Sequence, residues 1–135
     1  MPANESIPIY DAGRRITGQT SAAVTGKRFV MISGNRTSGP GLSSTSEGGN
    51  VVVAHATAAG RVFGVAAHDA ASGEKVPVLR GAGLVLPVTA ASNLTAFQEV
   101  EVGANGQATA KSAGVAVGYA INACASGADA EISLY

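Results

Sequence analysis

The sequence has no tryptophan, a single cysteine and few charged side chains. The lone Cys124 excludes an internal disulfide framework and any site built from several cysteines, and its small apolar neighbours predict a buried side chain. Charged residues make up 13% of the chain, about half of the usual quarter. A surface with so few charges is often covered by another protein, which favours an assembly subunit over a freely diffusing enzyme.

The chain also lacks long apolar runs. Its first residues, "MPANESIPIYD", contain no basic region and no apolar stretch, so we expect no signal peptide. The longest apolar runs fall far short of the roughly 18 residues that a membrane helix needs. We therefore expect a soluble protein, made in a cytoplasm, with no membrane partner.

Charge is balanced overall but unevenly placed. Residues 1–36 carry five basic and two acidic groups, whereas residues 37–135 carry four basic and seven acidic groups. A basic segment can dock on an acidic partner. No aromatic platform or nucleic-acid motif accompanies these scattered charges, so direct nucleic-acid binding is not expected.

Short β-rich runs, separated by Gly, Asn and Ser, replace any long helical periodicity. This spacing predicts an all-β fold, a small single-domain barrel or sandwich built from hairpins. One short helical turn is possible around residues 90–96. The expected strands are 28–33, 50–56, 61–67, 75–80, 83–88, 98–102, 107–110, 114–120 and 130–135.

The predicted β domain spans residues 16–135. Two segments, one before it and one within it, differ from the rest of the chain in composition. Residues 1–15 predict an extended N-terminal arm, because Pro2 and Pro8 oppose helix. Residues 33–50, "SGNRTSGPGLSSTSEGGN", predict a long exposed loop rich in Gly and Ser. Either segment could contact a partner.

One phrase occurs twice. "VFGVAAHDAASGEKVPV" (62–78) returns as "AVGYAINACASGADAEI" (116–132), and the copies share turn residues while reactive side chains vary. The phrase therefore predicts a hairpin-like unit, two copies of which form two quarters of a barrel or sandwich. Gly73 and Gly127 are expected at positive φ, and Gly64 and Gly118 at bulges or close backbone approaches. Asn105-Gly106 predicts a hairpin turn.

No pattern of catalytic, metal-binding or cofactor-binding residues is recognisable. His68 and Asp69 are adjacent, so on a strand they would point to opposite faces, and His55 has no clustered carboxylate. Glu99 and Glu101 lie two apart and are best interpreted as a solvated strand face rather than an acid pair. Phosphate-binding, dinucleotide-binding and nucleophile-elbow motifs do not occur. We expect no enzyme and no cofactor.

Four stretches together resemble the capsid cement, or head decoration, proteins of tailed bacteriophages. They are "IYDAGRRITGQTSAAVTGKRFVMISG", "GRVFGVAAHDAASGEKVPVLRGAGLVLPV", "LTAFQEVEVGANGQATA" and "AGVAVGYAINACASGADAEISLY". The order of these Gly, Ala and Val patterns along residues 7–135 carries the resemblance. The loop at 33–50 is longer than the family core.

The resemblance implies a non-enzymatic virion protein. Such proteins bind the outer surface of the icosahedral head and clamp neighbouring major capsid protein subunits, often as homotrimers at three-fold or quasi-three-fold positions. Assembly would take place in the bacterial host cytoplasm. Apolar residues in an arm need a partner to cover them, so the capsid-contact candidates are Ile7, Ile9, Tyr10, Arg14 and Arg15. An ordinary edge strand is the other interpretation of Ile7 and Ile9.

Two other functions remain open. The first is another β-rich phage structural protein or a surface carbohydrate-binding module, which would present aromatic stacking groups. The second is a small enzyme or metal protein.

Overall fold

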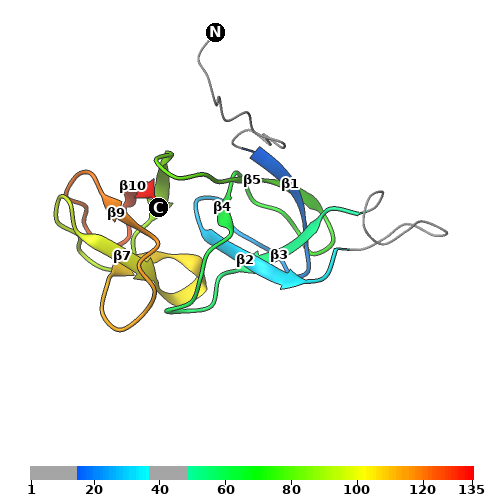
Figure 1. Ribbon diagram of the computed structural model, residues 1–135, viewed down its shortest axis with the longest axis horizontal. Helices are drawn as coiled ribbons and strands as arrows, with labels where there is room; N and C mark the ends of the chain where they lie inside the picture. Colours follow the sequence, from blue (N-terminus) through cyan, green and yellow to red (C-terminus); the bar gives the residue numbers. More distant parts are fainter. Residues whose placement is uncertain (1–14, 37–48) are drawn as a thin grey trace, which may run out of the picture.

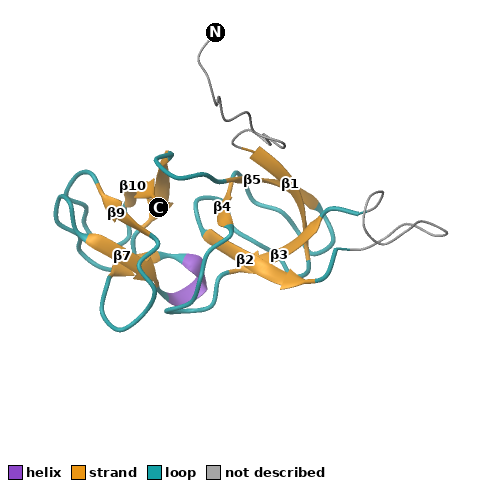
Figure 2. Ribbon diagram, in the orientation of Figure 1, coloured by secondary structure: helices purple, strands orange, loops and turns teal. Residues whose placement is uncertain are grey.

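Ten strands and one short 3-10 helix make up the computed structural model, which describes residues 15–36 and 49–135. Figure 1 shows two groups of strands side by side, and Figure 2 shows that the regular structure is almost entirely strand. The all-β prediction is therefore confirmed. The elements are β1 (Arg15–Thr20), β2 (Phe29–Gly34), β3 (Val51–His55), β4 (Gly64–Ala66), β5 (Lys75–Leu79), β6 (Val85–Thr89), β7 (Glu99–Val102), η1 (Ala104–Gly106), β8 (Ala108–Ala110), β9 (Gly118–Ala120) and β10 (Asp129–Leu134).

The first five strands form a closed barrel in the order β1-β3-β2-β4-β5. β1 is antiparallel to β5 and parallel to β3, which closes the sheet on itself. We call residues 15–79 the first unit. Closure pairs the edge strands, which would otherwise expose free backbone groups.

The last five strands repeat this pairing in the order β6-β10-β9-β7-β8. β6 pairs with β10 as β1 pairs with β5, and β7 pairs with β9 as β2 pairs with β4. Isolated bridges agree as well, since Leu94–Cys124 corresponds to Val24–Ala70. We call residues 85–134 the second unit.

The repeat is therefore larger than the sequence predicted. The repeated phrase is the β4–β5 hairpin of the first unit and the β9–β10 hairpin of the second. Each phrase lies in its own five-stranded sheet, so the interpretation of the two copies as two quarters of one barrel or sandwich is wrong. β1 lies outside the strand ranges that the residue pattern predicts. No helix forms at residues 90–96, where Leu94 bridges to Cys124 instead.

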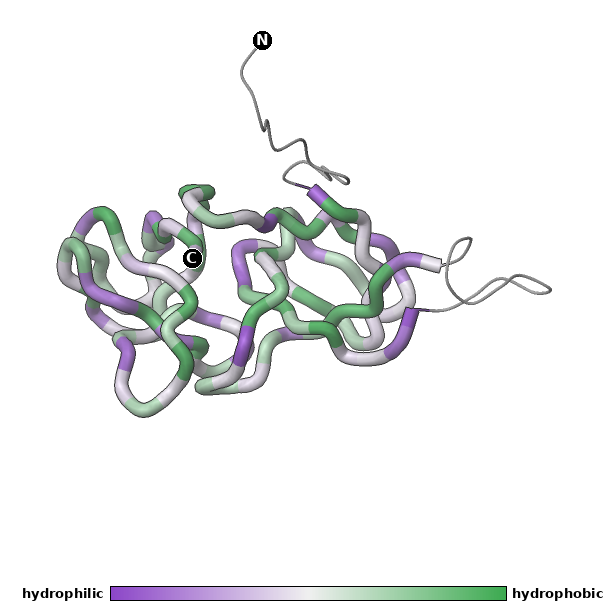
Figure 3. Tube along the Cα trace, viewed as in Figure 1, coloured by the Kyte–Doolittle hydropathy of each residue, from purple (hydrophilic) through white to green (hydrophobic). Residues whose placement is uncertain are grey.

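Alternating strand residues fill each unit. In the first unit, the buried residues are Val24, Val30, Val53, Ala66, Ala70, Val76 and Val78. The second core holds the corresponding side chains and also takes Phe29, Ala56 and Val65 from the first unit. Figure 3 shows apolar segments in the strands of both units. Each fully buried large apolar side chain contributes about 1.5–3 kcal/mol.

Turn glycines have the backbone geometry that the sequence predicted. Gly73 and Gly127 have φ of 86° and 88° at equivalent turns. At Gly64 a Cβ would lie 2.6 Å from the Leu79 carbonyl oxygen, and at Gly118 it would collide with the Ser133 carbonyl oxygen. Both expectations, positive φ at the turns and close backbone approach within the strands, are confirmed.

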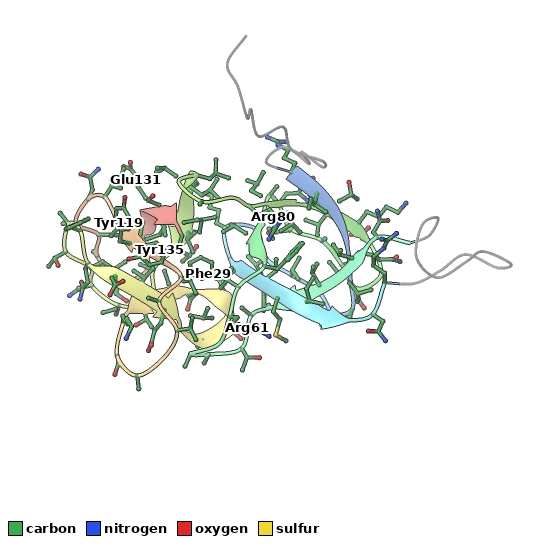
Figure 4. All side chains as sticks on the ribbon, in the orientation of Figure 1. Phe29, Arg61, Arg80, Tyr119, Glu131 and Tyr135 are labelled. Carbon is green, nitrogen blue, oxygen red and sulfur yellow. The ribbon has the colours of Figure 1, made fainter. Side chains whose placement is uncertain are left out.

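The two units meet along one face of the first. Phe29 lies fully buried there, and Figure 4 places it between the units. The Thr89 N–H donates to the Lys27 carbonyl at 3.0 Å, and an Arg28 guanidinium N–H donates to the Asn105 carbonyl at 3.1 Å. A shared buried cluster and direct hydrogen bonds therefore join the two units.

One ion pair crosses this junction. Lys27 Nζ lies 2.7 Å from Asp129 Oδ2. This hydrogen bond to Lys27 is the main cause that holds the pKa of Asp129 below its usual range. Both side chains are well exposed, so the pair contributes less to stability than the apolar contacts beside it.

Candidate binding surface

Four of the five predicted contact residues, Ile7, Ile9, Tyr10 and Arg14, lie outside the described residues. Arg15 is exposed and is the first residue of β1, where it pairs with Leu79. The last position assigned to the arm therefore belongs to the sheet. Most of the predicted loop at 33–50 also lies outside the described residues.

The two histidines make structural contacts. His55 Nε2 accepts the Thr25 N–H at 2.9 Å, which requires that nitrogen to be unprotonated. Burial, followed by the charge of Arg28, lowers the pKa of His55. Asp69 Oδ1 accepts the Gly26 N–H at 2.8 Å, and the His68 ring contacts the Asp69 carbonyl oxygen at 2.8 Å. These contacts fix loops of the first unit.

Glu99 and Glu101 occupy different environments. Glu101 is buried and its Oε2 accepts the Gly114 N–H at 2.5 Å, whereas Glu99 is exposed. The interpretation of both residues as a solvated strand face is therefore wrong for Glu101. Its carboxylate is used to hold the segment before β9.

Ligand-type side chains do not gather in the described parts of the chain. Within residues 15–36 and 49–135, no three His, Cys, Asp or Glu side chains lie close enough to hold a metal ion. No helix in these ranges is long and apolar enough to cross a membrane. Cys124 is partly buried against the core, and its thiol contacts the Ala125 carbonyl oxygen at 3.3 Å.

A partly exposed aromatic cluster lies on the second unit. Phe97 and Tyr119 meet edge to face with ring centroids 5.2 Å apart, and Tyr119 and Tyr135 lie 5.9 Å apart. The Tyr135 hydroxyl donates to Glu99 at 2.6 Å, and this bond is the main cause that raises the pKa of Tyr135. We call these four residues the aromatic face.

Strand pairing assembles this face. Tyr119 on β9 pairs with Glu99 on β7 and with Ser133 on β10, so side chains far apart in sequence become neighbours. In the sequence the aromatic residues look like ordinary strand residues, and their gathering was missed. The only signal was that each lies in a different predicted strand or directly beside one.

Comparison of the sequence with known protein families identifies the family of this chain. The sequence model for the phage cement protein family matches residues 10–134. The chain belongs to the phage cement protein family. The resemblance noted in the sequence is thereby confirmed, and the chain is a structural component of the phage capsid. No curated protein matches the chain.

A solved structure shares the fold of this cement protein. The base of the head fiber, the gp8.5 N base of bacteriophage phi29, superposes with a TM-score of 0.68 at 17% identity. The match covers 90% of this chain and 92% of the phi29 chain. At this identity the likeness concerns the fold alone, and it extends over both units.

Proposed function

We propose that this cement protein binds the outer surface of the icosahedral head and stabilises contacts between major capsid protein subunits. The observation that carries the proposal is the family match over nearly the whole chain. In this proposal the protein performs no catalysis and is assembled onto heads in the bacterial host cytoplasm. The shared fold of a phage head fiber base also supports a position on the outside of the head.

Cementing requires several weak contacts made together. A homotrimer at a three-fold or quasi-three-fold position touches several capsid subunits at once, and multivalent binding can exceed the single affinity by about 10²–10⁴-fold. The two-unit architecture suits this role because each chain presents a long surface. We propose the homotrimer as the bound form and the major capsid protein as the partner.

Purified particles provide the test. We expect the chain to sediment with virions on a density gradient, in a fixed ratio to the major capsid protein that the lattice sets. Particles assembled without it should release DNA at a lower temperature, since the clamp is missing. A chain found only in the soluble fraction of the lysate would contradict the proposal.

Residues 1–14 carry the proposed capsid contacts Ile7, Ile9, Tyr10 and Arg14, and Arg15 extends them into β1. In this proposal residues 1–14 form an arm outside the β domain, so removing them should leave the unfolding temperature unchanged. Binding to empty heads that lack the protein should weaken roughly tenfold or more, a loss of about 1.4 kcal/mol or more. Pelleting with heads measures this affinity.

The matched control removes only residues 1–6 and keeps all the proposed contacts. We expect it to bind heads as the full chain does. If the 1–14 deletion unfolds, the segment belongs to the domain. If it folds and binds normally, capsid contact lies elsewhere on the chain.

A further inference from the structure

The aromatic face exposes more apolar ring surface than an isolated chain would be expected to leave in water. Phe97 is 79% exposed and Tyr135 is 57% exposed. Ile121, two residues after Tyr119, is 40% exposed. Contiguous exposed rings of this kind mark interaction surfaces.

The repeat shows what covers this face in the first unit. Residues Lys27, Phe29 and Val65 take the places of Phe97, Glu99 and Tyr119, because Phe29 pairs with Val65 as Glu99 pairs with Tyr119. Phe29 and Val65 are fully buried in the cluster that they form with residues of the second unit. In the first unit this outer face is thus a docking surface for another unit of the same fold.

The backbone at Phe97 does not account for its ring. Phe97 has φ of 66°, and Lys27, which takes the same place in the first unit, has φ of 60°. The left-handed conformation is therefore a property of the fold, and it accepts a lysine. The fold itself therefore does not require an aromatic side chain at this exposed position.

A complementary groove lies on the first unit. Its walls are mainly apolar, and Ile32 within it is 48% exposed. Arg61 is exposed at this groove and makes no hydrogen bond or ion pair within the described part of the chain. The lining residues are Met31, Ile32, Thr57, Gly60, Arg61, Val62 and Phe63.

Charge favours contact between unlike units. Residues 15–79 contain six basic and three acidic residues, a net +3, whereas residues 85–135 contain one basic and four acidic residues, a net −3. On the second unit, Glu99 belongs to the aromatic face, and Glu131 lies on β10 two residues before Ser133, which pairs with Tyr119. Complementary charge steers association and fixes its orientation.

We infer that the aromatic face of one copy docks into the Arg61 groove of a second copy, head to tail. The rings of Phe97, Tyr119 and Tyr135 cover the apolar groove, and Arg61 lies against the acidic second unit. A head-to-tail contact is heterologous, so it generates a closed ring where the rotation permits and an open filament where it does not. The inference names the surfaces that join the copies. The role of this contact at the capsid rests on the proposed function.

Another occupant of the face fits the geometry less well. A carbohydrate stacks on flat aromatic platforms, but Phe97 and Tyr119 stand at 83° and Tyr119 and Tyr135 at 51°. The rings present edges and a ridge rather than a platform. A ridge suits insertion into a groove.

Sedimentation equilibrium of the purified full chain tests the inference. We expect reversible self-association, weakened about 30-fold or more by Phe97→Lys, the scale of an interface hot spot. Lysine stands at the equivalent position at the same φ, so this variant should stay folded and lose no more stability than its contact with Tyr119 supplies. Ala128→Lys is the control, because it adds the same charge at an exposed position. Ala128 precedes β10, whereas Tyr135 follows the other end of that strand. It should associate as wild type.

A mixing experiment tests the head-to-tail geometry. Arg61→Glu should weaken association on its own, by damaging the groove. Mixed with Phe97→Lys, it should form a one-to-one dimer that cannot grow, because the pair retains one intact aromatic face and one intact groove. A face that binds only another aromatic face would leave Arg61→Glu associated as wild type, and this would overturn the inference.

The inference and the proposed function fail separately. A wild-type chain that stays monomeric in solution, or a Phe97→Lys variant that associates normally, overturns the head-to-tail contact even if the chain is found in virions. A chain that associates through these surfaces but is absent from virions overturns the capsid role alone.

Discussion

Replacing Phe29 with alanine is expected to lower the free energy of unfolding by about 3–5 kcal/mol. Phe29 is fully buried, and its cluster joins strands of the first unit to the core of the second. The lost ring removes apolar contacts and leaves a cavity that two rigid sheets cannot close. Urea denaturation followed by circular dichroism measures the change.

Phe97→Ala is the matched control for this prediction. It removes the same ring from an exposed site, where the ring contact with Tyr119 is lost. We expect a cost below about 1.5 kcal/mol, the upper value of an aromatic pair. Equal costs for the two variants would mean that the junction between the units contributes little to stability.

The hairpins could be predicted from the sequence because turns use few residue types. Asn105-Gly106 joins β7 to β8, and both residues have positive φ, as a tight turn of this kind requires. Gly73 and Gly127 mark the same turn in both units. These signals are local, and backbone geometry at such positions tolerates little variation.

The complete repeat could not be predicted, because the equivalent outer faces have opposite surroundings. Phe29 and Val65 are buried against the second unit, while their counterparts Glu99 and Tyr119 face outward. Buried and exposed positions take different residue types, so the two units share recognisable sequence only in their later hairpins. The longer segment between β2 and β3 also changes the spacing between the two copies.

The aromatic face was hidden for a related reason. Phe97, Tyr119 and Tyr135 come from three segments, and only the pairing of β9 with both β7 and β10 brings them together. A strand's neighbours depend on the order of strands in the sheet, which the periodicity of each strand does not encode. The contact candidates near the N-terminus, in contrast, rest on sequence alone and stay a prediction.

Gly106→Ala is expected to destabilise the protein by about 2–5 kcal/mol, because two costs add. Gly106 has φ of 72°, where an added Cβ costs about 1–2 kcal/mol. In addition, that Cβ would lie 2.5 Å from the Phe29 carbonyl oxygen, which belongs to the other unit. Backbone on one side of the junction would have to shift, at about 1–3 kcal/mol.

Gly73→Ala separates the two costs. Gly73 has φ of 86°, but a Cβ there meets nothing within 4 Å, so only the conformational cost of about 1–2 kcal/mol remains. The difference between the two variants in chemical denaturation therefore measures the close approach of η1 to β2. If the two variants lower the free energy of unfolding equally, the backbone at the junction shifts at little cost. The two units would then be held less rigidly than the burial of Phe29 indicates. A large difference would show that the position of one unit on the other is fixed at this glycine, as the proposed clamp between capsid subunits requires.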